Sequence, residues 1–153
     1  MEQKENLKEL LAQGRLKQHK AAAQEIGKLF AVIERDIKDA KVENVSLDRR
    51  FTIAYNAALQ AGRALLAAEG YRTSGQAHHA TVFQALRSLL DQEHHHLLDY
   101  MDDCRSKRNL AEYMGTEIAS EQETEELIEE AQSFAGFARS LIRKNYPHLL
   151  TQK

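Results

Sequence analysis

The stretch RRFTIAYNAALQAGRALLAAEG, residues 49–70, determines which fold to expect of this chain. It contains no proline, and it is rich in alanine and leucine, which are strong helix formers, so it predicts one long helix that ends before Gly70. The many alanines and Gly62 give this helix little bulk, so neighbouring helices can approach it closely. We therefore interpret it as the central helix of a bundle.

Apolar residues at intervals of three and four predict further amphipathic helices on both sides of this stretch. Their expected ranges are 2–13, 16–40, 77–90, 95–114 and 121–146, with a loop over 71–76. Either Ser46 or Asp48 can cap the central helix, Ser120 and Glu123 have the spacing of a capping box, and Pro147 ends the last helix. Because runs of β-branched residues are absent, the predicted fold class is an all-α helical bundle.

Length and composition favour one compact domain. With 153 residues, 42% of them apolar, the chain can supply one hydrophobic core but hardly two. We divide it into a helical segment, 1–44, packed on a bundle formed by 45–146. A net charge of −2 argues against a surface coated with positive charge for nonspecific binding of nucleic acid. Cys104 is the one cysteine, and neither a signal peptide nor a membrane span is visible, so the expected location is the cytoplasm.

A second stretch, DDCRSKRNLAEYMG at residues 102–115, has an unusual charge pattern. In a helix with about 100° per residue, Arg108 falls in the same apolar sector as Met101 and Cys104. A buried guanidinium needs a partner, which is either an acid from another helix or protomer, or a bound phosphate. Asn109 and Tyr113 could add hydrogen bonds or a stacking ring to a phosphate site.

Three segments resemble the HEPN superfamily of small helical bundles, especially its minimal stand-alone members. They are AYNAALQAGRALLAAEGYR, HHATVFQAL and RSKRNLAEY, and the resemblance covers roughly residues 45–145. It implies a HEPN-like bundle of about four or five main helices with an N-terminal helical extension. It also implies a homodimer whose two motifs face a shared cleft. Many members of the superfamily are metal-independent ribonucleases, often toxins neutralised by a nucleotidyltransferase-like antitoxin, and others bind nucleic acids or nucleotides without catalysis.

Carried over by position, Arg108 matches the motif arginine and Asn109 its polar neighbour, while Tyr113 stands where the family has a histidine. Such a histidine transfers protons near neutral pH, which a phenol with an ordinary pKa of about 10 does poorly. Histidines stand at the starts of two predicted helices, His78 and His79 at one and His94, His95 and His96 at the other. Folding could bring one of them to the cleft as a replacement, and we include His79 in the predicted ligand site. The resemblance thus implies catalytic roles for Arg108, Asn109 and Tyr113, and a ligand site that adds Arg105 and His79.

We therefore predict a protein that binds RNA or a nucleotide in a toxin–antitoxin or defence setting, without a cofactor or a metal. Its metal-independent endoribonuclease activity, if it has any, is expected to be weak. Two alternatives stay open. The same residues could serve a noncatalytic helical interaction module. His95, Asp99 and Asp103, which share a helix face at i, i+4 and i+8, could instead supply the ligands of a metal-binding bundle.

Overall fold

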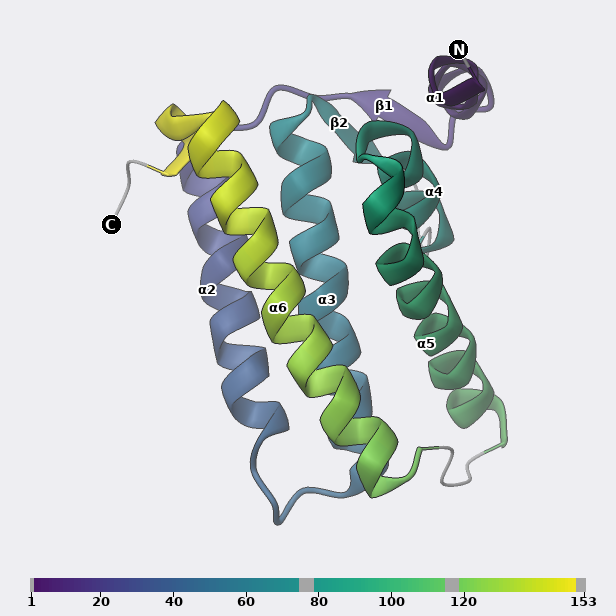
Figure 1. Cartoon of the computed structure of the whole chain (residues 1–153), viewed down its shortest axis with the longest axis vertical. Coiled ribbons are helices and arrows are strands. Elements are labelled where there is room, and N and C mark those ends of the chain that lie inside the picture. The colour runs from purple at the N-terminus through teal and green to yellow at the C-terminus, as the bar shows by residue number, and fades with distance from the viewer. Residues whose placement is uncertain (1, 75–78, 115–118, 151–153) are drawn as a thin grey trace.

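The computed structural model describes residues 2–74, 79–114 and 119–150 of the chain. Its elements are α1 (Glu2–Ala12), β1 (Leu16–Gln18), α2 (Ala23–Ala40), α3 (Leu47–Ala68), β2 (Tyr71–Thr73), α4 (His79–Leu89), η1 (Gln92–His94), α5 (His95–Met114), α6 (Glu121–Asn145) and η2 (Pro147–Leu150). Helices α2, α3 and α6 lie side by side along the long axis, and α4 and α5 also pack against α3 (Figure 1). The predicted all-α helical bundle is confirmed. None of the described helices combines the length and apolar content that crossing a membrane requires.

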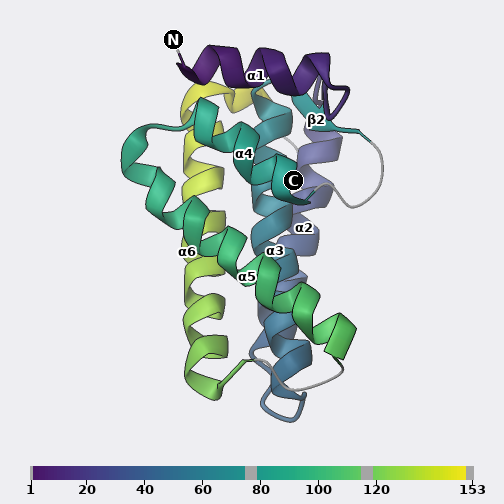
Figure 2. The ribbon, with the colours of Figure 1, turned by 90° about the vertical axis from the view of Figure 1, so that its right-hand side faces the viewer.

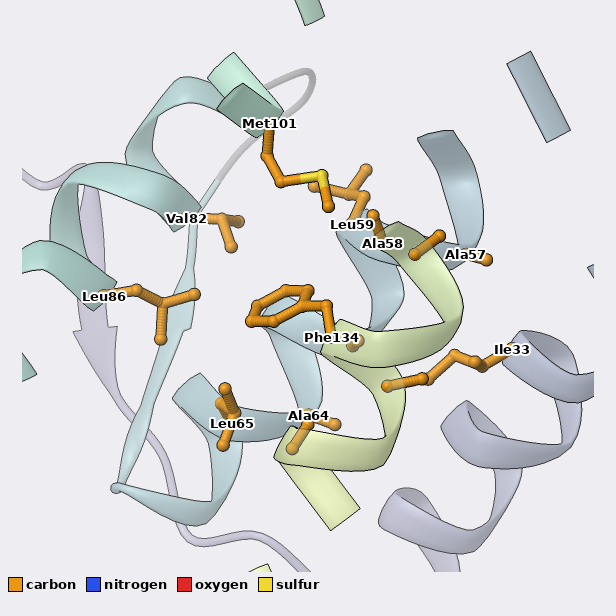
Figure 3. Close-up of a cluster of buried hydrophobic side chains, with 14 of the residues drawn as sticks. Ile33, Ala57, Ala58, Leu59, Ala64, Leu65, Val82, Leu86, Met101 and Phe134 are labelled. Carbon is orange, nitrogen blue, oxygen red and sulfur yellow. The ribbon is translucent and has the colours of Figure 1, made fainter. Parts of the chain in front are cut away.

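The alanine-rich stretch forms α3, which lies at the centre of the core as predicted. Ala57, Ala58, Ala61 and Ala64 have no exposed surface, because α2, α4, α5 and α6 all contact this helix. Phe134 of α6 points into the space between α3 and α4, where Figure 3 shows it among a cluster of buried aliphatic side chains. Small residues on α3 therefore make room for larger side chains that its neighbours supply.

Two short segments differ from the sequence prediction. The apolar pattern predicts a helix from residue 16 and a loop over 71–76, but β1 and β2 form an antiparallel pair, and α2 begins only at Ala23. Leu16 lies opposite Thr73 and is 1% exposed, so the strand buries an apolar side chain while its backbone is satisfied by pairing. A local pattern missed both strands because each needs a partner that is distant in the sequence.

Most of the predicted helix ends are confirmed. Ser46, rather than Asp48, caps α3, and its side chain accepts a hydrogen bond from the backbone N–H of Arg49 at 3.4 Å. Both hydrogen bonds of the capping box between Ser120 and Glu123 are present at the start of α6, which ends at Asn145. Gly14 and Gly70 follow α1 and α3 with φ angles of 72° and 101°, a backbone region that favours glycine.

Helix α1 lies across one end of the bundle and packs on α4 (Figure 2). Asn6 donates a hydrogen bond to the Ser88 hydroxyl at 2.7 Å, and Arg15, just after α1, donates to Gln84 at 2.6 Å. The predicted division between residues 44 and 45 falls in the turn between α2 and α3. Side chains from both parts belong to the same hydrophobic core.

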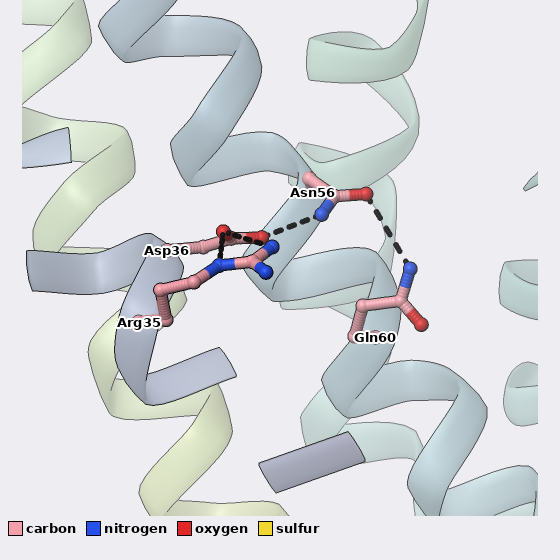
Figure 4. Close-up of polar contacts among 4 residues, drawn as sticks. All are labelled: Arg35, Asp36, Asn56 and Gln60. Carbon is pink, nitrogen blue, oxygen red and sulfur yellow. Dashed lines mark hydrogen bonds and ion pairs between the residues drawn. The ribbon is translucent and has the colours of Figure 1, made fainter. Parts of the chain in front are cut away.

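A buried carboxylate joins α2 to α3. Asp36 is 5% exposed and accepts hydrogen bonds from Arg35 at 2.9 Å and from the Asn56 amide at 2.6 Å. Gln60 extends this chain of contacts by donating to Asn56, as the dashed lines in Figure 4 show. Since a buried charge is tolerated only when it is paired and hydrogen-bonded, this set holds α2 in register along α3.

Candidate functional site

Helix α5 carries the unusual charge pattern, and one side of it enters the core. Leu98, Met101 and Cys104 on this side are buried. Arg108 follows on the same side and is half-buried, and its Cζ atom lies 5.8 Å from the centroid of the Tyr55 ring on α3. A guanidinium over an aromatic face is attracted by the ring's negative π surface. Tyr55 is therefore one partner of Arg108, and the sequence analysis did not anticipate it.

Tyr55 also links Arg108 to His79. Its hydroxyl lies 3.4 Å from Nδ1 of His79, the first residue of α4, and the two ring centroids are 5.9 Å apart. Folding thus brings one of the predicted ligand residues, His79, to the same tyrosine as the motif arginine. The sequence held one signal for Tyr55, because a tyrosine with a polar tip is conspicuous in a helix otherwise rich in alanine and leucine.

Burial determines the charge state of Tyr55. Desolvation raises the pKa of its phenol well above the ordinary value, although the positive charges of Arg108 and Arg105 act in the opposite direction. The Tyr55 hydroxyl therefore stays protonated at physiological pH. A neutral hydroxyl next to Nδ1 can hold the His79 ring in place.

Arg105 lies one helical turn before Arg108 and is held by an acid on its own helix. Its Nε donates a hydrogen bond to Asp102 at 2.8 Å, and this bond raises the pKa of the guanidinium. The Arg105 side chain is 26% exposed. Asp102 therefore neutralises part of the positive charge that Arg105 brings to this side of α5.

Asn109 and Tyr113, the other predicted site residues, do not join this group. Asn109 has the same intermediate exposure as Arg108, whereas Tyr113 is 92% exposed on the last turn of α5. Leu110, between them, is also exposed. The structure therefore divides the predicted site into an inner part around Tyr55 and an outer, solvent-facing part at the end of α5.

The residues proposed for the metal-binding alternative are used in other ways. His95 Nε2 lies 2.8 Å from the backbone carbonyl of Arg87, and Asp99 forms an ion pair with the Arg87 guanidinium. Within residues 2–74, 79–114 and 119–150, no group of three or more His, Cys, Asp and Glu side chains is arranged to hold a metal ion. The geometry gives no support to a metal centre at His95, Asp99 and Asp103.

We call Tyr55, His79, Arg105 and Arg108 the Arg108 cluster. It combines two guanidiniums, which can bind an anion, with an imidazole, which can transfer a proton near neutral pH. Comparison of the chain with models of protein families, with curated proteins and with solved structures found no match. The resemblance to the HEPN superfamily therefore rests on the three sequence segments quoted above.

Proposed function

We propose that this chain is a HEPN-like protein that binds RNA or a nucleotide through a phosphate group at the Arg108 cluster. The observation that carries the proposal is the half-buried Arg108 guanidinium, held over the Tyr55 ring beside His79. An arginine positioned in this way presents its donors in a fixed direction, which suits bidentate contact with phosphate oxygens. By resemblance, we place it in a toxin–antitoxin or defence setting with a nucleotidyltransferase-like antitoxin as its partner.

Arg108→Ala tests the phosphate site. Binding of a fluorescein-labelled single-stranded RNA, measured by anisotropy at low salt, should weaken at least about tenfold, because a charge-assisted hydrogen-bond pair is lost. Arg72→Ala, which removes an exposed arginine of β2, is the matched control and should change affinity little. Circular dichroism of both variants monitors folding. Equal losses in the two variants, or no loss in either, would contradict the proposal.

Any cleavage of RNA by this site should depend on His79 rather than Tyr113. An imidazole within the cluster can take the proton of the ribose 2′-OH, whereas the Tyr113 side chain lies in solvent, outside the cluster. We expect His79→Asn to reduce metal-independent cleavage about a hundredfold, the usual size of a general-base effect. Tyr113→Phe and the control His96→Asn should leave cleavage nearly unchanged. Loss of cleavage on Tyr113→Phe with retained RNA affinity would assign the role to Tyr113.

We also propose a homodimer that uses the end of α5. Leu110 and Tyr113 are 53% and 92% exposed, and Val42 is the third exposed large apolar side chain among the described residues. Apolar side chains near a site that the family shares between two protomers are suited to a two-fold contact. Leu110→Glu should convert a dimer into a monomer in analytical ultracentrifugation, whereas Val42→Glu should not. A wild-type monomer at micromolar concentration would contradict this part of the proposal.

A further inference from the structure

A groove without α5 residues runs between α2 and α6. It exists because both helices pack along α3 and make few contacts with each other. Two adjoining cavities, of about 330 and 500 Å³, form it, and they share Phe30, Glu34 and Arg139. The 3-10 helix η2 contributes Leu149 and Leu150 to the larger cavity. None of these residues belongs to the Arg108 cluster, so this surface is a separate one.

The groove is strongly cationic although the chain as a whole is slightly acidic. Among the residues that the structure describes, five cationic side chains line it, and they are Lys28, Lys38, Lys41, Arg139 and Arg143. Within the same described lining, Glu34 is the one carboxylate, and it is already paired with Arg139 at 2.6 Å. Across the two cavities, the other four cationic side chains can therefore attract acidic side chains of another molecule.

The base of the groove is apolar. Phe30, Ile33 and Ile37 come from α2, and Ala135 comes from α6. The Arg139 guanidinium covers the Phe30 ring, with its Cζ 4.5 Å from the ring centroid. The ring is therefore not free to stack on a nucleic-acid base, and an apolar base offers nothing to a phosphate backbone. Both features favour a protein ligand over RNA.

A glycine stands on each wall of the groove, Gly27 in α2 and Gly136 in α6. Each lies within a helix, and a Cβ atom added at either position would have no atom within 4 Å. Glycine within a helix is less stable than alanine at the same position. The chain's own packing does not explain that cost, but the glycines would let another backbone approach both walls closely.

We propose that the groove between α2 and α6 is the docking site of an acidic amphipathic helix from another protein. Its apolar side chains lie on the apolar base, mainly on the partly exposed Ile37, and its flanking Asp and Glu side chains pair with the lysines of the rim. An extended segment would bring unpaired backbone groups to the apolar base, whereas a helix satisfies its own backbone. Helix α2, with 18 residues, offers a wall about 27 Å long, enough for several turns of a partner.

The test uses a synthetic, fluorescein-labelled helix with leucine at i, i+3, i+4 and i+7 and glutamate elsewhere. Anisotropy should detect binding of this peptide to the wild-type protein. The affinity should be at least tenfold weaker in the Lys38→Glu/Lys41→Glu double variant and in Gly136→Leu. Lys8→Glu/Lys17→Glu, on exposed lysines of α1 and β1, is the charge control. Ser140→Leu, outside the groove lining on α6, is the size control. Neither control should change binding, and melting curves should show that all variants fold.

Three other probes separate the alternatives. A peptide with lysine in place of glutamate and a scrambled peptide of the same composition should both fail to bind. Single-stranded RNA should bind the groove variants as it binds wild type, because its site is the Arg108 cluster. The proposal is overturned if the acidic helix does not bind, or if the groove variants and the control variants lose peptide binding equally. It is also overturned if the groove variants lose RNA binding or dimerisation instead of peptide binding. If the groove variants lose only binding of the acidic helix and retain RNA binding, the proposal is supported.

Discussion

Gly62 of α3 faces Val82 and Leu86 of α4, and replacing it with alanine tests how the core is packed. An ideal Cβ at this position would lie 3.0 Å from Val82 Cγ1 and 3.3 Å from Leu86 Cδ1. Both separations are shorter than ordinary van der Waals contacts. Alanine at 62 therefore forces α4 or its two side chains to move outward. Gly136→Ala is the matched comparison, because its Cβ would meet no atom within 4 Å.

The two substitutions share a gain in helix propensity, but only the one at Gly62 also overpacks the core. Each should gain about 1 kcal/mol from the higher helix propensity of alanine. Overpacking opposes this gain at Gly62 only, by about 1–3 kcal/mol. We expect Gly62→Ala to lower the free energy of unfolding by about 1 kcal/mol and Gly136→Ala to raise it by about the same amount.

Urea unfolding followed by far-UV circular dichroism measures both values, provided that the two variants share the wild-type dependence on denaturant. Val82→Ala in the Gly62→Ala background should recover part of the loss, because the closest contact is removed. A Gly62→Ala variant as stable as Gly136→Ala would refute this account of the packing. It would mean that α4 moves away from α3 at no cost, and that glycine is not required at the crossing.

Three further predictions concern helix ends and exposed groups. Ser120→Ala should lower the free energy of unfolding by about 1 kcal/mol in urea denaturation, because it removes the cap of α6. The ion pair with Lys107, helped by hydrogen bonds with Ser120, lowers the pKa of Glu123 to about 2. The stability that this carboxylate contributes is complete above its ordinary pKa of 4.5 and is lost as the pH falls toward 2. The difference in free energy of unfolding between wild type and Lys107→Met should therefore shrink as the pH falls from 4.5 to about 2. The pair is half-exposed, so the difference should stay below about 1 kcal/mol and diminish in high salt. Tyr113→Phe should change the free energy of unfolding by less than about 0.5 kcal/mol, since the side chain is exposed. Any loss of RNA affinity in the anisotropy assay should be about 1 kcal/mol, which corresponds to one hydrogen bond.

Helix positions could be predicted where the signals are local. Ser46, Gly70, Ser120 and Pro147 each act within one or two turns of a helix end, and the structure confirms the ends that they predict. The segment from residue 16 was predicted wrongly, because the pattern of α2 was extended backward into residues that pair with β2. Strand pairing between distant segments leaves no periodic signal in three residues.

The candidate site shows the same division. Position on the helix was enough to place Arg108 on the apolar side of α5, because helical geometry is the same in any fold. The resemblance to the HEPN motif grouped Asn109 and Tyr113 with it, and the structure instead leaves Tyr113 in solvent. The contact of Arg108 with Tyr55 depends on how α5 packs against α3, which is a property of the tertiary structure.

The sequence by itself determined the helical class, the central place of the alanine-rich helix and the position of Arg108 on the apolar side of α5, because helix propensity, capping and periodicity act over a few residues. Only the tertiary structure decided that His79 and Arg108 both meet Tyr55, and that α2 and α6 leave a cationic groove between them. Both arrangements join residues from separate helices. Their geometry depends on how side chains of different volume fit around the small residues of α3, and no local pattern records that fit.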